Sequence, residues 1–333
     1  MKILIFGATG LVGRTMMKVL EERLGSLAFN NIELLLAAST RSKGKTLTFA
    51  GQSLRVVSPE EALNAGADIA LFSAGAEASL SWAPRFAEKG VYVIDNSSAW
   101  RKDPAVPLVV PEINAHSIRK DHYLIANPNC STIQMVAALA PLHRAYQCDR
   151  IVVSTYQSVS GSGMPGMVQL YNERQGKSGP RAYPHPIDRN LIPQGGHFLP
   201  DGSTTEEEKL VLETRKILGD ASIRIAATVV RVPVEFGHSE AINVSFKKPF
   251  TLEAVRHLLT STPGLEMQDE PTSHIYPMPL MATGQDAVFI GRLRVDPSEK
   301  NTLQLWVVAD NLRKGAATNA IQIAEWLITE AYV

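Results

Sequence analysis

The sequence predicts an α/β protein with two domains: a Rossmann-type, doubly wound parallel sheet, and an α+β domain with a mainly antiparallel sheet. Over the first 130 residues, short apolar runs alternate with helical stretches, which is typical of βαβ units in a parallel sheet. Beyond about residue 147 the strand-like runs become longer, and several of them interleave polar and apolar residues. The 333 residues are enough to bury a core in each of two domains.

Each predicted element follows from a local pattern. Apolar runs in the first domain predict buried strands at 2–6, 32–38, 68–72, 91–94 and 123–126. Helical periodicity between these runs predicts helices over 12–24 and 78–88. The longer runs of the second domain predict strands at 150–157, 223–232, 241–246, 287–295 and 302–308. Five prolines between residues 180 and 200 predict an ordered loop, and residues 312–333 predict a long final helix.

Charge and composition exclude several classes of protein. The chain carries 33 Lys plus Arg and 33 Asp plus Glu, so no bulk charge favours nucleic acid or an anionic membrane as a partner. No apolar run approaches the roughly 18 residues of a membrane span. Two cysteines make no disulfide framework and fit a reducing compartment. Because Gly7, Gly10 and Gly13 interrupt the apolar start before a signal-peptide core is complete, we expect a cytoplasmic protein.

Cys130 lies where an apolar strand is predicted to turn into a helix, in the segment Asn127-Pro-Asn-Cys-Ser-Thr132. At a helix N-terminus the terminal amides and the helix dipole favour the reactive thiolate, and the same amides can hold an oxyanion. The local pattern alone fits a buried structural cysteine equally well, because cysteine is among the most buried residue types. The second cysteine, Cys148, lacks such a setting and is expected to be structural.

A glycine-rich turn directly follows the first predicted strand and opens the first predicted helix. Gly7, Gly10 and Gly13 have the spacing G-x-x-G-x-x-G, which permits a tight turn and lets the backbone approach a pyrophosphate at the helix N-terminus. Such turns also occur for packing alone. The position at the first strand and helix favours the nucleotide site.

The end of the second predicted strand favours NADP over NAD. An NAD site usually offers an Asp or Glu there for the ribose 2′-hydroxyl. This chain instead has Ser39, Arg41 and Ser42, followed by two lysines and no acid. A guanidinium suits a 2′-phosphate, and the alternative is an ordinary basic surface loop.

Four further stretches carry polar groups that could do chemistry, at 93–101, 155–163, 203–209 and 230–240. Each has a structural alternative as well. Ser203 and Glu206 match the capping-box pattern, so Glu206 could serve only to cap a helix. Lys209 could be a solvated surface residue, and a single histidine such as His238 is more often structural than catalytic. None of the four stretches decides the function by itself.

Together these motifs resemble the aspartate-β-semialdehyde dehydrogenase family, in the family's order and from the first residue to the final helix. The matching stretches are 7–13, 39–45, 96–101, 127–134, 157–163, Glu206 with Lys209, Arg231 with His238, and 310–319. The resemblance implies an NADP-binding domain over 1–129 that is completed by the helix 312–333. It implies a catalytic, substrate-binding and dimerisation domain over 130–311, a homodimer formed through that domain, and no metal.

The activity that the resemblance implies is the NADPH-dependent reduction of L-4-aspartyl phosphate to L-aspartate 4-semialdehyde. This reaction serves the biosynthesis of lysine, threonine, methionine, isoleucine and diaminopimelate. Cys130 would be the nucleophile that forms a thioester, His238 the general acid/base, and Gln157 would orient the acyl intermediate. The remaining roles are implied in the same way.

The resemblance also implies which residues bind substrate and cofactor. The phosphate would be held by Arg101, Asn129 and Lys209. Arg231 would clamp the substrate α-carboxylate in bidentate fashion, and Glu206 would pair with the α-ammonium group. Cofactor contacts would come from Gly7, Thr9, Gly10, Leu11, Val12, Gly13, Ser39, Arg41, Ser42, Ser160, Gly161 and Asn311.

Sequence motifs argue against some related enzymes with this fold and leave other functions open. N-acetyl-γ-glutamyl-phosphate reductase typically has glycine before its cysteine, whereas Asn129 precedes Cys130 here. The Ser-Cys-Thr-Thr-Asn motif of glyceraldehyde-3-phosphate dehydrogenase is absent. Malonyl-CoA reductase stays open, as does a non-catalytic nucleotide-binding paralogue, although such paralogues tend to lose the cysteine or the histidine.

Overall fold

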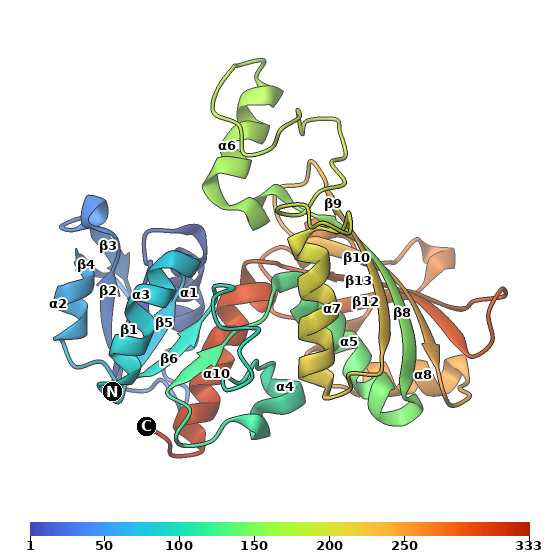
Figure 1. The fold of residues 1–333 in the computed structure, drawn as a ribbon, viewed down its shortest axis with the longest axis horizontal. Coiled ribbons are helices and arrows are strands. Elements are labelled where there is room, and N and C mark those ends of the chain that lie inside the picture. The colour runs from blue at the N-terminus through green and yellow to red at the C-terminus, as the bar shows by residue number, and fades with distance from the viewer. The chain divides into compact units, whose positions relative to one another are not determined.

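The computed structural model describes all 333 residues, which form two compact units (Figure 1). The first unit comprises Met1–Asn129 and Ala316–Val333, and the second comprises Cys130–Gly315. Each unit has a sheet and a hydrophobic core of its own. No helix in either unit combines the length and the apolar character needed to cross a membrane.

The sheet of the first unit has seven strands, and every neighbouring pair is parallel except one pair at the edge. In spatial order the strands are β3 (Thr46–Phe49), β4 (Gln52–Val57), β2 (Glu33–Ala37), β1 (Lys2–Phe6), β5 (Ile69–Phe72), β6 (Tyr92–Asp95) and β7 (Leu124–Ala126). The five predicted strands are β1, β2, β5, β6 and β7. This doubly wound sheet confirms the predicted fold class of the first domain.

Sequence patterns alone do not predict the edge hairpin β3–β4. Its strands have mostly exposed or half-buried residues, so they contain no continuous apolar run. The signal that marks the hairpin is its two-residue turn, where Ala50 and Gly51 have φ values of +48° and +77°. Positive φ at both central residues is the conformation that joins tightly paired antiparallel strands.

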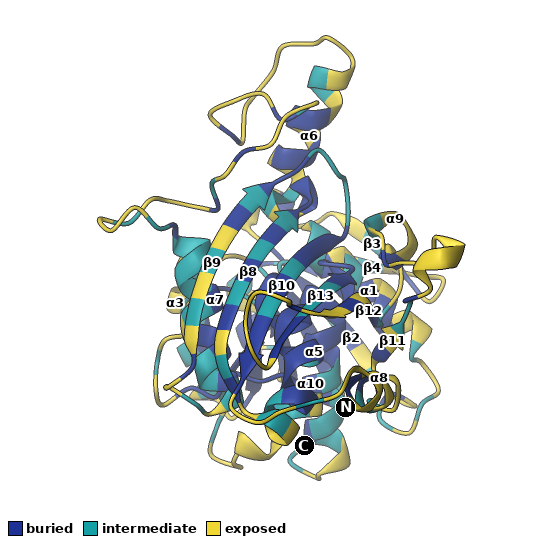
Figure 2. Cartoon of the chain, turned by 90° about the vertical axis from the view of Figure 1, so that its right-hand side faces the viewer, coloured by how far each residue is buried: buried dark blue, intermediate teal, exposed yellow.

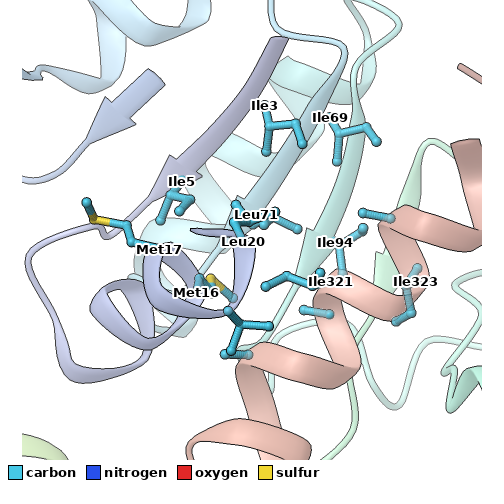
Figure 3. Packing of buried hydrophobic residues seen from close by; sticks show 14 of the residues in the cluster. Ile3, Ile5, Met16, Met17, Leu20, Ile69, Leu71, Ile94, Ile321 and Ile323 are labelled. Atoms are coloured by element: carbon cyan, nitrogen blue, oxygen red, sulfur yellow. The ribbon is translucent and has the colours of Figure 1, made fainter. Parts of the chain in front are cut away.

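Five helices accompany this sheet: α1 (Leu11–Glu22), α2 (Pro59–Leu63), α3 (Ala76–Ala87), α4 (Pro111–Asn114) and α10 (Thr318–Thr329). Between the strands and the pair α1 and α10, Ile5, Leu71 and Ile94 pack with Met16 and Ile321 (Figure 3). Burying one such side chain contributes about 1.5–3 kcal/mol. The C-terminal segment is therefore part of the first core.

The long final helix predicted over 312–333 is wrong in its first turn. A five-residue π-helix occupies Arg313–Ala317, and the regular helix α10 begins at Thr318. Hydrophobic periodicity does not distinguish the two kinds of turn. A π-turn widens the backbone locally and is frequent at functional sites.

The second unit is built on a six-stranded sheet whose central pairs are antiparallel. In spatial order the strands are β11 (Leu265–Met267), β12 (Val288–Val295), β13 (Thr302–Ala309), β10 (His238–Phe246), β8 (Cys148–Gln157) and β9 (Arg224–Arg231). The two outer pairs, β11–β12 and β8–β9, are parallel, so the sheet is mixed. The strand predicted at 241–246 starts earlier, at His238, which brings that residue into the sheet.

Helices cover one face of this sheet. They are α5 (Cys130–Tyr146), α7 (Thr205–Leu218) and α8 (Leu252–Thr260), with Met135 and Leu139 of α5 in one core with Ile242 and Val244 of β10. On the face turned to the viewer in Figure 2, no helix lies over β8, β10 and β13. Two more helices are α6 (Gly163–Arg174), which extends beyond the sheet in Figure 1, and the short α9 (Pro279–Ala282).

Candidate active site

The glycine-rich turn of the first unit is shaped by close backbone approaches. Gly7 has φ of +103°, and a Cβ there would lie 2.8 Å from the carbonyl carbon of Ser73, the residue after β5. A Cβ on Gly13 would lie 2.3 Å from the Gly7 carbonyl oxygen, because α1 packs directly on the turn. Gly10 has no such restriction and is the N-cap of α1. Only two of the three glycines are required by the turn itself.

The same turn fits the phosphates of a dinucleotide. It lies at the carboxyl end of β1, beside β5, where the chain reverses its direction of travel across the sheet, and open α/β sheets bind ligands at this point. The first turn of α1 has no acidic residue and no side-chain cap, so its amides remain available to an anion. Leu11 and Val12 are the first two residues of that helix. The Thr9 hydroxyl donates to Ser42 Oγ at 3.4 Å and links the turn to the loop after β2.

In the loop after β2, the cations differ in their availability. Lys43 is paired with Glu61 at 2.8 Å. Arg41 is exposed and forms no ion pair in the structure, whereas Ser42 is buried and Ser39 is exposed. Of Arg41 and Lys43, Arg41 is therefore the cation that is ready to meet a 2′-phosphate.

Arg101 belongs to the first unit and is held at the carboxyl edge of its sheet. Its Nη2 donates to the Asn96 carbonyl oxygen at 2.7 Å. Asn96 is fixed in turn, because its Nδ2 donates to the Phe72 carbonyl and its Oδ1 accepts from Asn127 Nδ2 at 2.7 Å. Asn319 of α10 extends this row by donating to Asn127 Oδ1 at 2.7 Å. The row of amides connects the ends of β5, β6 and β7 with the start of the final helix.

Asp95 anchors the loop that leads to Arg101. The carboxylate is fully buried and accepts from the backbone and hydroxyl of Ser97, the latter at 2.5 Å. Burial raises the pKa of Asp95, while Ser97, Ser79 and Arg101 act in the opposite direction. Ser79 also accepts from the Trp100 ring nitrogen at 2.9 Å, so the loop is tied to α3.

In the second unit, Cys130 is the first residue of α5, as predicted. The first turn carries no acidic residue, and its amides and dipole favour an anionic sulfur at this position. A Cβ on Gly315 would lie 2.8 Å from Cys130 Cβ, so the glycine lets the backbone pass beside the thiol. Gln157, at the end of β8, donates through Nε2 to Ser131 Oγ at 2.8 Å. Gln157 is thereby tied to the residue next to the cysteine.

His238 is completely buried at the start of β10. Its Nδ1 lies 3.1 Å from the Ser158 amide nitrogen and 3.0 Å from Ser158 Oγ. Its Nε2 has no partner, which is rare for a buried nitrogen and is what a proton-transfer residue needs before substrate binds. Burial, with the charge of Arg231, lowers the pKa of His238 to about 3, while Gly237 and Glu206 act in the opposite direction. The imidazole is therefore neutral in the resting protein.

Ser158 is in turn held by Asn311. Ser158 Oγ donates to Asn311 Oδ1 at 3.1 Å, and the Gly237 amide donates to the same atom at 2.9 Å. Ser160 joins this network at 3.2 Å from Asn311 Oδ1. Ser160 and Asn311, predicted from the family resemblance to contact the cofactor, thus also belong to the hydrogen-bond network of His238.

Arg231 lies at the end of β9, directly opposite Gln157 of β8. Its Nη1 donates to the Ser158 carbonyl oxygen at 2.9 Å, its guanidinium lies 5.9 Å from the centre of the Tyr183 ring, and its Nε has no partner. A Cβ on Gly161 would lie 2.8 Å from Nη1. The residue lacks a carboxylate partner and retains donors for one supplied by a ligand.

Glu206 and Lys209 form an ion pair with each other near the start of α7. The capping box suggested by Ser203 and Glu206 is wrong by one residue. Thr204 is the N-cap, its side chain accepts from the Glu207 amide, and Glu207 accepts from the Thr204 amide at 2.6 Å. Because Glu207 caps the helix, the carboxylate of Glu206 takes no part in the capping box.

Two buried polar residues of this region have no predicted role from the sequence. Ser158 falls within the predicted stretch 155–163 without a role of its own, although its position directly after Gln157 is a signal that it belongs to the same site. Glu240 is completely buried on β10 with neither carboxyl oxygen hydrogen-bonded, and burial raises its pKa well above the ordinary value. Its alternation with His238 on one strand places it on the same face of the sheet.

Comparison with known proteins identifies the family. The model described as "Semialdehyde dehydrogenase, NAD binding domain" matches residues 2–121, and "Semialdehyde dehydrogenase, dimerisation domain" matches 139–314. The chain is 50% identical to aspartate-semialdehyde dehydrogenase of Aquifex aeolicus, over 100% of this chain and 99% of that one. The Bacillus subtilis relative is 44% identical, with 98% and 96% covered.

Solved structures agree with this assignment. The crystal structure of aspartate semialdehyde dehydrogenase II from Vibrio cholerae superimposes with a TM-score of 0.93 at 47% identity, covering 99% of this chain and 98% of that one. A second structure of that Vibrio protein, described as complexed with ASA, gives the same TM-score at 46% identity. The predicted family and the two-domain fold class are confirmed.

Proposed function

The chain belongs to the semialdehyde dehydrogenase family, and from that premise we propose that it is an aspartate-semialdehyde dehydrogenase that reduces L-4-aspartyl phosphate with NADPH. One observation carries the proposal. Gln157 donates a hydrogen bond to Ser131, the residue that follows Cys130. The next residue, Ser158, donates one to His238. A nucleophile at a helix start and a buried imidazole with an open Nε2 are thus tied to one loop.

The covalent step uses Cys130 and His238. The thiol proton passes to His238 Nε2, the sulfur bonds to the acyl carbon of aspartyl phosphate, and the acyl–oxygen bond breaks with release of phosphate. When bound, NADPH supplies the hydride that reduces the resulting thioester. The carbon–sulfur bond then breaks, and the Nε2 proton returns to the sulfur as the semialdehyde leaves. Amides of the first turn of α5 stabilise the oxyanion of each tetrahedral stage.

Recognition of the substrate's charges falls to Arg231, Glu206 and Lys209. Arg231 is the clamp for the α-carboxylate, because no carboxylate of the chain occupies its guanidinium. The ion pair of Glu206 with Lys209 supports an exchange of partners: the substrate ammonium takes the place of Lys209 on Glu206, and Lys209 turns to the phosphate. Arg101 and Asn129 are proposed as further ligands of the phosphate, as the family resemblance implies.

NADP is the proposed cofactor. The close approaches at Gly7 and Gly13 support a pyrophosphate cradle that a side chain would fill, and the first turn of α1 is open to an anion. Arg41 and Ser42 would hold the 2′-phosphate, and Ser39 would adjoin it. The remaining contacts are proposed as the sequence predicted them: Thr9, Gly10, Leu11, Val12, Ser160, Gly161 and Asn311.

A homodimer through the second unit is also proposed. The family model that matches this part of the chain is described as a dimerisation domain. On the sheet face opposite α5, Ala241, Tyr276, Met278 and Trp306 line a groove with a volume of about 430 Å³, together with Arg292 and Arg294. An uncovered apolar groove on a sheet supports burial against a second copy. The cytoplasmic location predicted from the sequence is proposed with it.

The test compares three substrates with the wild-type enzyme. We expect the largest kcat/KM with L-4-aspartyl phosphate, because Arg231 and Glu206 match its carboxylate and ammonium. N-acetylglutamyl phosphate lacks the cation and adds bulk, and malonyl-CoA has no ammonium group, so both should react at least about 10²-fold less efficiently. A preference for either would contradict the proposed substrate while leaving the cysteine chemistry intact.

A further inference from the structure

Nδ1 of His238 lies between two groups of one residue that favour opposite protonation states. The Ser158 amide, 3.1 Å away, can only donate a hydrogen bond. The Ser158 hydroxyl oxygen, 3.0 Å away, can accept one. A neutral imidazole carries its proton on one nitrogen only, so the group that prevails at Nδ1 decides whether Nε2 is an acid or a base.

The direction of the Ser158 hydroxyl follows from Asn311. The Gly237 amide donates to Asn311 Oδ1 at 2.9 Å, which identifies this atom as the oxygen, because an amide N–H cannot donate to an NH₂ group. Ser158 Oγ lies 3.1 Å from the same oxygen and gives its single proton to it. A lone pair of Ser158 Oγ is then left for His238 Nδ1.

We propose that the Ser158 hydroxyl, oriented by Asn311, is the positioning group of His238 and accepts the Nδ1 proton whenever Nε2 acts as a base. This inference rests on the proposed function, because it gives a partner to the acid–base residue of that reaction. With the proton on Nδ1, Nε2 has a lone pair for the thiol proton. With the Ser158 amide donating to Nδ1 instead, Nε2 carries a proton.

The proton transfers balance under this arrangement. When Nε2 takes the thiol proton, the ring becomes an imidazolium whose Nδ1–H donates to Ser158 Oγ, and Ser158 keeps its own proton on Asn311. When the sulfur leaves the reduced carbon, Nε2 returns its proton to the sulfur and the ring is neutral again. Ser158 gains and loses no proton in the cycle.

A hydroxyl suits this site better than a carboxylate would. His238 is completely buried and close to Arg231, and both conditions disfavour the imidazolium. A carboxylate at Nδ1 would also favour the tautomer with a free Nε2 lone pair, but its charge would raise the pKa of the ring and stabilise the imidazolium against returning its proton to the sulfur. A neutral acceptor stabilises the imidazolium only while it forms, which matches a residue that must alternate between the two forms.

The direct test is the tautomer of His238 by NMR, with ¹⁵N-labelled histidine and the ring assigned from His238→Asn. In the wild type we expect the Nδ1 shift to lie between the pyridine and pyrrole types, because the two neutral tautomers exchange. Ser158→Ala keeps the backbone amide and removes the acceptor, so its Nδ1 shift should be fully pyridine-type. Ser154→Ala is the matched control for this readout, because Ser154 lies on the same strand, β8, and takes no part in the hydrogen bonds among Ser158, Ser160, Asn311 and His238.

Kinetics provide the second readout. Ser158→Ala should lower kcat on the order of 10–100-fold, the size expected for a hydrogen bond to a charged group, with each KM changed by less than about twofold. Ser158→Thr retains a hydroxyl and should recover most of the loss.

A purely pyridine-type Nδ1 in the wild type would overturn the proposal, and so would identical shifts in wild type and Ser158→Ala. Ser158→Ala with wild-type kcat would also overturn it. The NMR measurement uses the resting enzyme without substrate. A failure of the aspartyl-phosphate assignment would therefore leave the tautomer result unchanged, and the two failures can be distinguished.

Discussion

Helix α5 has one of the chain's two cysteines at each end, and their surroundings differ in every respect that controls thiol chemistry. Cys130 is the first residue of the helix, is partly accessible, and lies at the positive end of the helix dipole. Cys148 begins β8, two residues beyond the last helical residue, and lies in the hydrophobic core with no exposure. Burial raises the pKa of its thiol to about 12.

The comparison shows that reactivity here comes from helix polarity and neighbours rather than from residue type. The residue after Cys130 bonds to Gln157, whose neighbour Ser158 holds His238. At the other end, the Cys148 amide donates to His143 Nδ1 at 3.2 Å, and the pKa of that histidine is lowered by burial. A histidine is present near both ends of the helix, but only His238 has an open ring nitrogen among buried polar groups.

The largest expected effect separates the two cysteines directly. Cys130→Ala should lower kcat by at least about 10⁴-fold while NADPH still binds, because the thioester route is lost. Cys148→Ala should retain activity and lose some stability, because it leaves a small cavity in the core. Steady-state rates, NADPH titration by fluorescence and thermal unfolding of both variants provide the check. Activity in Cys130→Ala with inactivity in Cys148→Ala would reverse the assignment.

The next effect concerns substrate binding around the reactive end. Arg231→Leu removes the proposed carboxylate clamp and should lower kcat/KM by roughly 10²-fold or more, since the clamp also positions the acyl carbon. Arg224→Leu, at the exposed start of the same strand, is the matched control and should stay within about threefold of wild type. Equal losses in the two variants would indicate a general effect on β9 rather than a clamp.

A smaller effect is expected in the first unit, remote in sequence from either cysteine. Arg41→Ala should reduce the preference for NADP over NAD by about 1–3 kcal/mol, which is the range for a charge-assisted contact. Lys43→Ala is the control, because that lysine is already paired with Glu61. The ratio of kcat/KM for NADPH and NADH measures the effect. A wild-type enzyme that used both cofactors equally well would contradict the assignment.

The smallest effect tests the buried acid on the strand of His238. Glu240 has a folded-state pKa raised by burial, so its contribution to stability is present at acidic pH and is lost as the pH rises through that raised value. Glu240→Gln keeps a neutral side chain and should therefore gain stability over wild type above about pH 4.5, by up to about 1.4 kcal/mol for each pH unit. Gln134, whose Nε2 donates to the His238 carbonyl at 3.3 Å, lies against the carboxyl group.

Urea unfolding at pH 4.5 and pH 8 measures this difference, with exposed Glu266→Gln as the control. A gain that is the same at both pH values would contradict a raised pKa for Glu240, and a loss at pH 8 would do so as well.

Sequence patterns predicted the strands that have a continuous apolar run or an alternation of polar and apolar residues, and missed elements that have neither. Strands β1, β5 and β6 are continuous apolar runs, whereas the exposed hairpin β3–β4 has none. The helix α6 begins with Gly163, Pro165 and Gly166, which are helix-breaking residues, so its pattern does not favour a helix. These elements depend on tertiary contacts and turn geometry that periodicity does not record.

Residue types in the site were predictable, but their mutual arrangement was not. The thiol at the start of a helix follows from one local motif. The tie between Ser158 and His238 joins residues 80 positions apart and requires the register of β8 with β10. The cap at Thr204 rather than Ser203 differs by one residue, which sequence matching to a capping box does not resolve.

The most direct test of the central claim is to locate the acyl intermediate. The enzyme is mixed with L-4-aspartyl phosphate in the absence of NADPH, and the reaction is quenched in acid. The protein is then digested, and mass spectrometry measures the masses of the two peptides that contain Cys130 and Cys148. We predict an aspartyl adduct on the Cys130 peptide, none on the Cys148 peptide, and none on either in Cys130→Ala. An adduct on Cys148, or turnover by the wild type with no adduct on Cys130, would contradict the account.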